Sequence, residues 1–358
     1  MNKEKEMVVP ELRFSEFENE GDWKEKTLVN IAEIVTGTTP KTSESENYGG
    51  NKLFVSPADI SGKRYISKTI KTLSEIGFSK SRVLPENSIL FVCIGSTIGK
   101  IAQNKIECAT NQQINSLIPF ENYSNDFIYS LLENNSYRIA SLAGHQAVPL
   151  INKTDFSEIL VLLPPTKLEQ QKIANCLSSL DNLITAETEK LDHLKDHKKG
   201  LLQQLFPTNG ETKPQFRFLE FKNDGDWEEK DLKSFCYNIS SGKDKNIDNG
   251  KNDLYGSTGI IGKTNNSSYV GNFILVARVG ANAGLLNRAY GQFGVTDNTL
   301  VLNLKEPKKI DFIFYTLTNI GLNKLVFGSG QPLVTGKQLK ELNIPTPKNL
   351  KEQQKIAN

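Results

Sequence analysis

The amino-acid sequence predicts an α+β fold in which two duplicated domains are separated by a long helix. The segment from Pro10 to Leu28 returns from Pro214 to Leu232, and Trp23 and Trp227 occupy matching places at a constant offset of 204. A second segment, LEQQKIAN, ends at Asn175 and returns at the end of the chain with an offset of 183. A repeat this long exceeds the roughly 20–50-residue period of a solenoid. It therefore indicates two copies of one domain, each with near-constant ends that frame variable contents.

Composition restricts the class of protein without identifying it. The chain has 358 residues, 37% of them hydrophobic, and a formal net charge of +2, which neither favours nor excludes nucleic acid as a partner. No run of about 18 apolar residues is present and the N-terminus lacks an apolar signal core, so we expect a cytoplasmic protein with no membrane contact. The four cysteines lack CxxC spacing and are expected to be reduced thiols.

The two blocks repeat the same internal pattern of strand and turn. An apolar run over residues 88–94 ends at Gly95, and a matching run over residues 273–279 ends at Gly280. Glycine after a strand permits positive φ and a close approach of backbone. Short strands mixed with helical segments indicate an α+β domain in each copy. We expect a first domain over residues 1–165, a spacer helix over 166–206, a second domain over 207–348 and the start of a second long helix over 349–358.

The spacer helix has a predicted start and a coiled-coil pattern. Thr166 followed by Glu169 is a capping-box sequence. From Glu169 to Leu205 the helix would be about 55 Å long at 1.5 Å per residue. Apolar spacing of 3.5 over about four heptads predicts packing against a partner helix, although an ordinary amphipathic helix on its own domain remains open. The heptad positions are Ile173, Leu177, Leu180, Ile184, Leu191, Leu194, Leu201 and Leu205.

The second copy begins its helix in the same way. Asn349 is the expected N-cap, Glu352 follows three residues later, and the sequence ends at Asn358. About ten residues are too few to pair along the whole spacer helix. Either the helix is truncated here or its remainder comes from another polypeptide.

Motifs for catalysis are weak. The stretch from Gly95 to Lys100 is one residue short of a phosphate-binding loop and lacks its hydroxyl, so a turn after a strand is preferred. His193 and His197 are spaced i, i+4 on the predicted helix without nearby cysteines, which favours a solvated helix face over a metal pair. We therefore expect no catalytic residues, no metal and no cofactor.

Polar loops at matching places suit the reading of a polar polymer. Asn and Gln can form bidentate hydrogen bonds with adenine, Arg and Lys can do so with guanine, and Lys binds phosphates. Each loop alone could equally be ordinary surface, because turns favour these residue types. The candidate DNA-binding residues are Thr38, Thr39, Lys41, Ser96, Lys100, Asn111, Gln112 and Gln146 in the first block, and Lys243, Lys245, Arg278, Asn282, Asn298 and Gln331 in the second.

The chain resembles the DNA-specificity (S) subunits of type I restriction-modification enzymes. The motifs that carry the resemblance are the Trp23 and Trp227 openings, the GTTP loop at Gly37, and the E-Q-x-x-I-A helix starts at Glu169 and Glu352. The similarity extends over essentially all of the chain.

The resemblance implies two target-recognition domains, each reading one half of a bipartite DNA site. It also implies that the long helices dock methyltransferase (modification) subunits, expected to be two, and that motor-nuclease (restriction) subunits join through the complex. The S subunit of that family has no active site, so methylation and cleavage are expected from the partners.

Two other classes of function remain open. A tandem module that binds carbohydrate or protein would show the same duplication, and an aromatic-rich groove would favour it. A fused nuclease or methyltransferase would need motifs that this sequence lacks.

Overall fold

The protein consists of two compact units. The computed structural model describes residues 10–144, 148–208, 210–327 and 332–358. Contacts between Cα atoms divide the chain into Met1–Thr188 and Glu189–Asn358. None of the helices in the described ranges has the length and hydropathy of a membrane span.

The first unit contains a five-stranded sheet and a smaller, four-stranded sheet. The larger sheet has the order β2 (Ala32–Thr36), β10 (Ile114–Pro119), β7 (Ile89–Val92), β8 (Ile101–Asn104) and β4 (Tyr65–Ile66). The smaller sheet has the order β5 (Lys71–Leu73), β3 (Tyr48–Val55), β9 (Cys108–Thr110) and β6 (Val83–Leu84). The helices are α1 (Glu75–Ser79), α2 (Asn125–Ala140) and α3 (Lys153–Ser157), with 3-10 turns η1 (Ser15–Phe17), η2 (Leu28–Asn30) and η3 (Ser45–Asn47).

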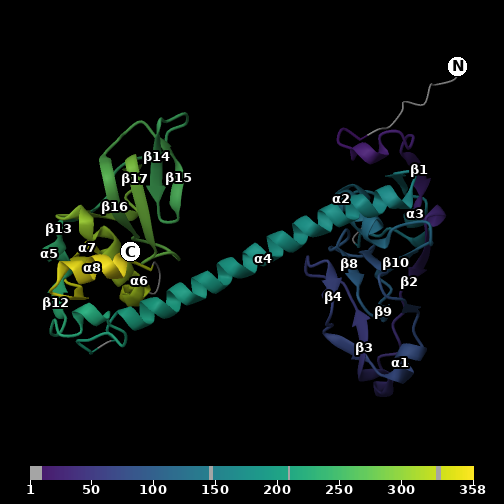
Figure 1. Ribbon diagram of the computed structural model, residues 1–358, viewed down its shortest axis with the longest axis horizontal. Coiled ribbons are helices and arrows are strands. Elements are labelled where there is room, and N and C mark those ends of the chain that lie inside the picture. The colour runs from purple at the N-terminus through teal and green to yellow at the C-terminus, as the bar shows by residue number, and fades with distance from the viewer. Residues whose placement is uncertain (1–9, 145–147, 209, 328–331) are drawn as a thin grey trace. The chain divides into compact units, whose positions relative to one another are not determined.

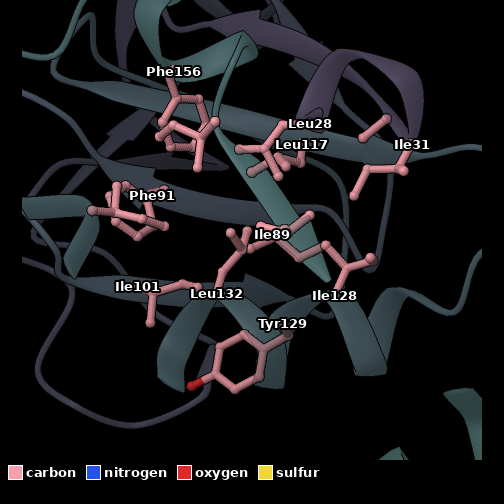
Figure 2. Packing of buried hydrophobic residues seen from close by; sticks show 14 of the residues in the cluster. Leu28, Ile31, Ile89, Phe91, Ile101, Leu117, Ile128, Tyr129, Leu132 and Phe156 are labelled. Carbon is pink, nitrogen blue, oxygen red and sulfur yellow. The ribbon is translucent and has the colours of Figure 1, made fainter. Parts of the chain in front are cut away.

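The core of this unit lies between the larger sheet and α2. All four residues of β7 are buried, as expected for the predicted apolar run. Helix α2 contacts β7, β8 and β10. Figure 2 shows Ile89 and Leu117 from the sheet pointing toward Ile128 and Leu132 of α2, with Leu28 closing the cluster.

The second unit repeats this framework. Its six-stranded sheet has the order β13 (Cys236–Ser241), β18 (Thr299–Leu304), β16 (Tyr269–Ala277), β17 (Leu286–Val295), β14 (Asn252–Gly256) and β15 (Gly259–Thr264). The helices are α5 (Leu232–Phe235), α6 (Ile310–Ile320), α7 (Gly336–Lys340) and α8 (Leu350–Ala357), with 3-10 turns η4 (Leu219–Phe221), η5 (Pro307–Lys309) and η6 (Leu322–Leu325). The order β13-β18-β16-β17 corresponds to β2-β10-β7-β8, so the predicted duplication of an α+β domain is confirmed.

A two-stranded sheet joins the two ends of each block. β1 (Lys24–Thr27) pairs antiparallel with β11 (Leu160–Leu163) in the first unit. β12 (Glu228–Asp231) pairs antiparallel with β19 (Asn343–Thr346) in the second. The start and the end of each variable block are therefore hydrogen-bonded to one another.

The repeated ends are also held by a buried cluster of arginine, glutamate and tryptophan, here termed the framework cluster. In the first unit, Arg13 donates to both carboxylate oxygens of Glu169 at 2.8 and 2.7 Å, and Trp23 Nε1 donates to Oε1 at 3.0 Å. Arg13 and Glu169 are 5% and 0% exposed. A buried carboxylate needs such partners, since an unpaired buried charge is strongly destabilising.

The second unit contains the same framework cluster. Arg217 donates to the two oxygens of Glu352 at 2.7 and 2.8 Å, and Trp227 Nε1 donates at 3.2 Å. The Glu352 hydrogen bond raises the pKa of the Arg217 guanidinium. The repeated sequence segments thus meet in space, which explains why both segments are nearly identical in the two copies.

The start of the long helix differs in one hydrogen bond from the capping box that the sequence predicts. Thr166 Oγ1 accepts from the Glu169 backbone N–H at 3.3 Å, as a capping box requires. The Glu169 side chain, however, is engaged by Arg13 and Trp23 instead of returning to the cap. At the second start, Asn349 accepts from the Lys351 N–H and Glu352 turns to Arg217 in the same way.

The predicted long helix is confirmed as α4 (Lys167–Leu205), which has 39 residues and is drawn as one continuous ribbon in Figure 1. Ile173 packs on the core of the first unit and Leu205 on that of the second. Between them the heptad side chains are exposed, from 39% at Leu201 to 64% at Ile184. The six exposed positions are Leu177, Leu180, Ile184, Leu191, Leu194 and Leu201, here termed the α4 stripe.

Candidate nucleic-acid interface

Three loops of the first unit meet at one end of the larger sheet. The loop after β2 joins the turn before β10 because Thr38 N–H donates to Thr110 O at 2.9 Å. The turn after β7 is tied in as Cys93 N–H donates to Gln113 O at 2.8 Å and Gly95 N–H to Pro149 O at 2.9 Å. We term residues 37–41, 94–100 and 110–113 the loop edge of the first unit.

The loop edge of the second unit, residues 242–246, 278–284 and 296–298, is assembled by equivalent bonds. Gly242 N–H donates to Thr299 O at 3.1 Å, and Arg278 N–H donates to Asn298 O at 2.8 Å. Gly280 N–H donates to Pro332 O at 2.9 Å, which matches the Gly95 bond of the first copy. The same backbone scaffold therefore presents different side chains in the two units.

Glycine is required at one place in each loop edge. A Cβ on Gly37 would lie 2.2 Å from Asn111 O, and a Cβ on Gly242 would lie 2.0 Å from Val295 O. Both distances are far below van der Waals contact. Any side chain there would separate the loop after the first strand from the turn that follows it in the sheet.

The structure brings most candidates of the first block together. Thr39 Oγ1 donates to Gln112 Oε1 at 2.6 Å, linking two of the loops, and both residues are exposed. Lys41 is exposed and lies 3.6 Å from Glu44. Asn111 Nδ2 donates to Gln113 Oε1 at 2.9 Å.

Ser96 and Lys100 lie in the turn between β7 and β8, as the turn interpretation of residues 95–100 predicted. Both residues are exposed, and Lys100 Nζ donates to Pro57 O at 3.4 Å. Thr38 Oγ1 accepts from the Arg82 backbone N–H at 3.2 Å. Gln146 lies outside the described residues.

In the second block, Lys243 and Lys245 are exposed on either side of the buried Asp244. Asp244 accepts from Ser268 Oγ at 2.7 Å and from Val295 N–H at 2.9 Å, which fixes this loop on the sheet. The lysines flanking it are thereby held outward.

Arg278 and Asn298 are adjacent through their backbone bond, and the Arg278 side chain reaches Asp297 O at 3.5 Å. Asn282 is exposed in the turn after Gly280 and lines a cavity of about 430 Å³ beside α6. Gln331 lies outside the described residues.

The sequence analysis missed two residues at the first loop edge, Gln113 within it and Arg82 next to it. Arg82 is exposed, and its Nη1 donates to Thr36 O at 2.7 Å, which puts a cation next to Thr38. Gln113, rather than Gln112, corresponds to Asn298, because each carbonyl accepts from the residue after the matching strand. The shared 185-residue offset was the available signal for Gln113, whereas nothing in the sequence linked Arg82 to the loop.

The three buried thiols are unsuited to catalysis at neutral pH. Cys93, Cys108 and Cys236 are buried and unpaired, and burial raises the pKa of each to about 12. A thiol reacts as its thiolate, so these side chains are inert. No group of three or more potential metal ligands occurs in the part of the chain that the structure describes, and His193 and His197 are exposed on α4.

A family model described as the type I restriction modification DNA specificity domain matches residues 20–196 and 224–358. The chain belongs to this family. The two matched ranges correspond to the two copies, and they contain the tryptophan and glutamate of each framework cluster.

Individual relatives carry the same description. The type I restriction enzyme HindI specificity subunit of Haemophilus influenzae is 30% identical over 183 residues, which cover 49% of this chain and 39% of that protein. The MjaVIII specificity subunit of Methanocaldococcus jannaschii is 27% identical over 375 residues, covering 94% and 84%. This chain therefore aligns with less than half of the first relative and most of the second.

A solved structure has the same fold. The S subunit of a type I restriction-modification system from M. genitalium matches with a TM-score of 0.68 at 17% identity, over 98% of this chain and 90% of that one.

Proposed function

We propose that this chain is the DNA-recognition subunit of a type I restriction-modification complex and that each unit reads one half of a bipartite site. One observation carries the proposal: the same backbone scaffold appears twice and presents different polar side chains from the same end of its sheet. Such an arrangement allows each unit to bind a different sequence of the same polymer in the same geometry. The proposed organisation is a first target-recognition domain over residues 1–165 and a second over 207–348, with the long helices at 166–206 and from 349.

The chemistry of the loop edges fits DNA. In the first unit, the linked Thr39 and Gln112 offer donors and acceptors to base edges, while Arg82 and Lys41 lie nearby as cations for phosphate or guanine. In the second unit, Asn298 and Arg278 supply the base-reading groups.

Lys243 and Lys245 supply the corresponding cations in the second unit. The buried Asp244 between them fixes the loop, so their charges are displayed at a defined place. Because the backbone that carries the two lysines is already ordered, phosphate binding does not have to order the loop.

The α4 stripe is the proposed docking surface for two modification subunits or for a partner helix. Its six apolar side chains are exposed in the single chain and follow a heptad pattern that is interrupted only at Glu187 and Lys198. Restriction subunits would join through the assembled complex. The chain itself is proposed to be non-catalytic, consistent with its inert buried thiols.

The test is methylome sequencing of cells that carry the chain together with type I modification subunits. We expect methylated sites with two specified halves and unspecified bases between them. Lys243→Ala with Lys245→Ala should reduce methylation at all sites. The matched control Lys308→Ala removes an exposed lysine at the other end of β18 and should leave methylation unchanged.

Two results would contradict the proposal. One is a methylome that is identical with and without the chain, although the complex assembles. The other is binding of carbohydrate or protein by the loop edges with no salt-dependent binding to DNA, which would support a tandem module of another class.

A further inference from the structure

Arg64, just before β4, connects three elements of the first unit. Its Nε donates to Gln103 Oε1 of β8 at 3.0 Å, its Nη2 pairs with Asp126 of α2, and its Nη1 donates to Ser178 Oγ of α4 at 2.9 Å. The guanidinium also lies over the Tyr129 ring, 4.6 Å from its centroid. The contact with Ser178 ties the reading domain directly to the long helix.

Arg288 of β17 occupies the corresponding place in the second unit. Its Nη1 pairs with Asp311 of α6, and its guanidinium lies 4.2 Å from the centroid of the Phe314 ring. Asp311 and Phe314 follow Asp126 and Tyr129 by 185 residues.

The two arginines reach this place by different routes. The position of Arg288 corresponds at the same offset to Gln103, not to Arg64. In the first unit Gln103 itself contacts Asp126 at 3.3 Å, and Arg64 is delivered from the neighbouring strand, where Tyr65 pairs with Gln103. The framework thus holds a guanidinium against the same carboxylate and ring even where the strand residue differs, which indicates a role for the guanidinium itself.

The two sites differ in their third contact. Arg64 Nη1 meets Ser178, but Arg288 Nη2 is buried without a hydrogen-bond partner among the described residues. At the 183-residue offset that relates Glu169 to Glu352, the equivalent of Ser178 would be position 361, one turn along the helix from Ala357. An unmet buried donor on a guanidinium is costly and rare, so this nitrogen marks a place for an acceptor.

We propose that Arg64 and Arg288 are positioning residues that hold each reading domain against the helix that follows it, α4 in the first unit and α8 in the second. The third contact of Arg64 is Ser178 on α4, and we infer that the unpaired nitrogen of Arg288 donates to a hydroxyl partner placed in the helical register of α8. The proposal rests on the proposed function for its effect on DNA sites, whereas the contacts themselves are tested without DNA.

The first experiment uses the route by which the second unit delivers its arginine. Arg64→Met should raise hydrogen exchange at residues 175–183 of the full chain by about tenfold, as one charged hydrogen bond is lost. Adding Gln103→Arg should restore protection, because the strand position then supplies the guanidinium as Arg288 does. Tyr65→Phe is the matched control, since the neighbouring ring keeps its face and the guanidinium is untouched.

A purely structural role for Arg64 predicts no rescue. If Arg64→Met/Gln103→Arg exchanges as fast as Arg64→Met, or if Arg64→Met leaves exchange unchanged, the positioning role is wrong. In the assembled complex, Arg64→Met should also broaden the spacing between methylated half-sites at unchanged half-site sequences. If Gln103→Arg restores protection but Arg64→Met leaves the half-site spacing unchanged, the link to DNA is wrong and the positioning role still holds.

The second experiment supplies an acceptor for Arg288 Nη2. Residues 176–183, CLSSLDNL, are appended after Asn358, so that their first serine is in register with Ser178. The Tm of the second unit should rise by about 2–4 °C. The gain should vanish when that serine is replaced by alanine or when Arg288→Met is introduced. An equal gain in all three chains would mean that the added helix packs without Arg288, and would overturn the proposal for the second unit.

Discussion

Removing the carboxylate of one framework cluster should destabilise one unit alone. In Glu352→Ala, Arg217 keeps its charge at 8% exposure and loses both ion-pair hydrogen bonds, and the Trp227 indole loses its acceptor. Breaking a buried ion pair by removing one partner costs about 3–5 kcal/mol. With a urea m-value of roughly 2 kcal/mol per M, the unfolding midpoint of the second unit should fall by about 1.5–2.5 M.

The assay is urea unfolding of the full chain read by hydrogen exchange and mass spectrometry, which follows peptides from β7 and β16 separately. The β16 transition should move and the β7 transition should not, since the cluster lies within the second unit. Glu352→Gln keeps one acceptor oxygen and should move the midpoint less. Glu341→Ala, which removes an exposed partner of Lys337 on the surface, is the control that should leave it in place.

Two outcomes would refute this reasoning. A shift of the β16 midpoint below about 0.5 M would mean that the framework cluster does not hold the repeated ends together. An equal shift of both transitions would mean that the units do not unfold separately. Glu169→Ala should give the mirror result, with β7 affected and β16 unchanged.

Three further predictions address the interface, the helix and pH. Arg82→Ala or Lys41→Ala should weaken DNA binding by the assembled complex and reduce the slope of log affinity against log salt by about one, while Lys24→Ala in β1 should change neither; filter binding at several salt concentrations measures this. Inserting four residues between Ala186 and Glu187 lengthens α4 by about 6 Å and should add one or two unread base pairs to the methylated site; altered half-site sequences, or an unaltered spacing in a folded protein, would show that α4 does not set the distance. Hydrogen bonds from Lys172 and Lys355 lower the pKa of Glu16 and Glu220 below their usual 4.5. The contribution of these two pairs to folding stability is therefore present above pH 4.5 and is lost as the pH falls through the lowered pKa. Glu16→Gln with Glu220→Gln should make Tm fall less steeply on the acid side of a plot of Tm against pH, and an unchanged fall would rule these pairs out as its cause.

The framework could be predicted from the sequence because the same buried ion pair has to be formed in both copies. A buried carboxylate must be matched by specific donors, so Arg13, Trp23 and Glu169 recur as a set and leave recognisable segments. The long helix was predictable for a related reason, since an apolar period of 3.5 needs no tertiary knowledge to be read. Its observed limits lie within two residues of the expected ones.

The contacts inside the variable blocks could not be predicted in the same way. Arg64 reaches Asp126 only because β4 pairs with β8, and no local pattern announces that pairing. Arg82 likewise joins the loop edge through the fold of the smaller sheet. Turn sequences allow several registers, and the candidates accordingly included Gln112 but not its neighbour Gln113, whose carbonyl is the counterpart of that of Asn298.

The small clasp formed by β1 and β11, and by β12 and β19, has a consequence for how freely the blocks can change. Between the paired strands lie the residues after Thr27 and before Leu160 in one copy, and after Asp231 and before Asn343 in the other. Closing the longer loop instead of the shorter one costs only about 0.15 kcal/mol more, because the entropy of closure grows with the logarithm of length. Gains and losses of whole turns or hairpins inside a block are therefore nearly neutral for the clasp. Natural variation can therefore change the interior of a block without any adjustment of its ends. A circular permutant of one unit, with new termini in an exposed interior loop and the original ends joined, should still fold.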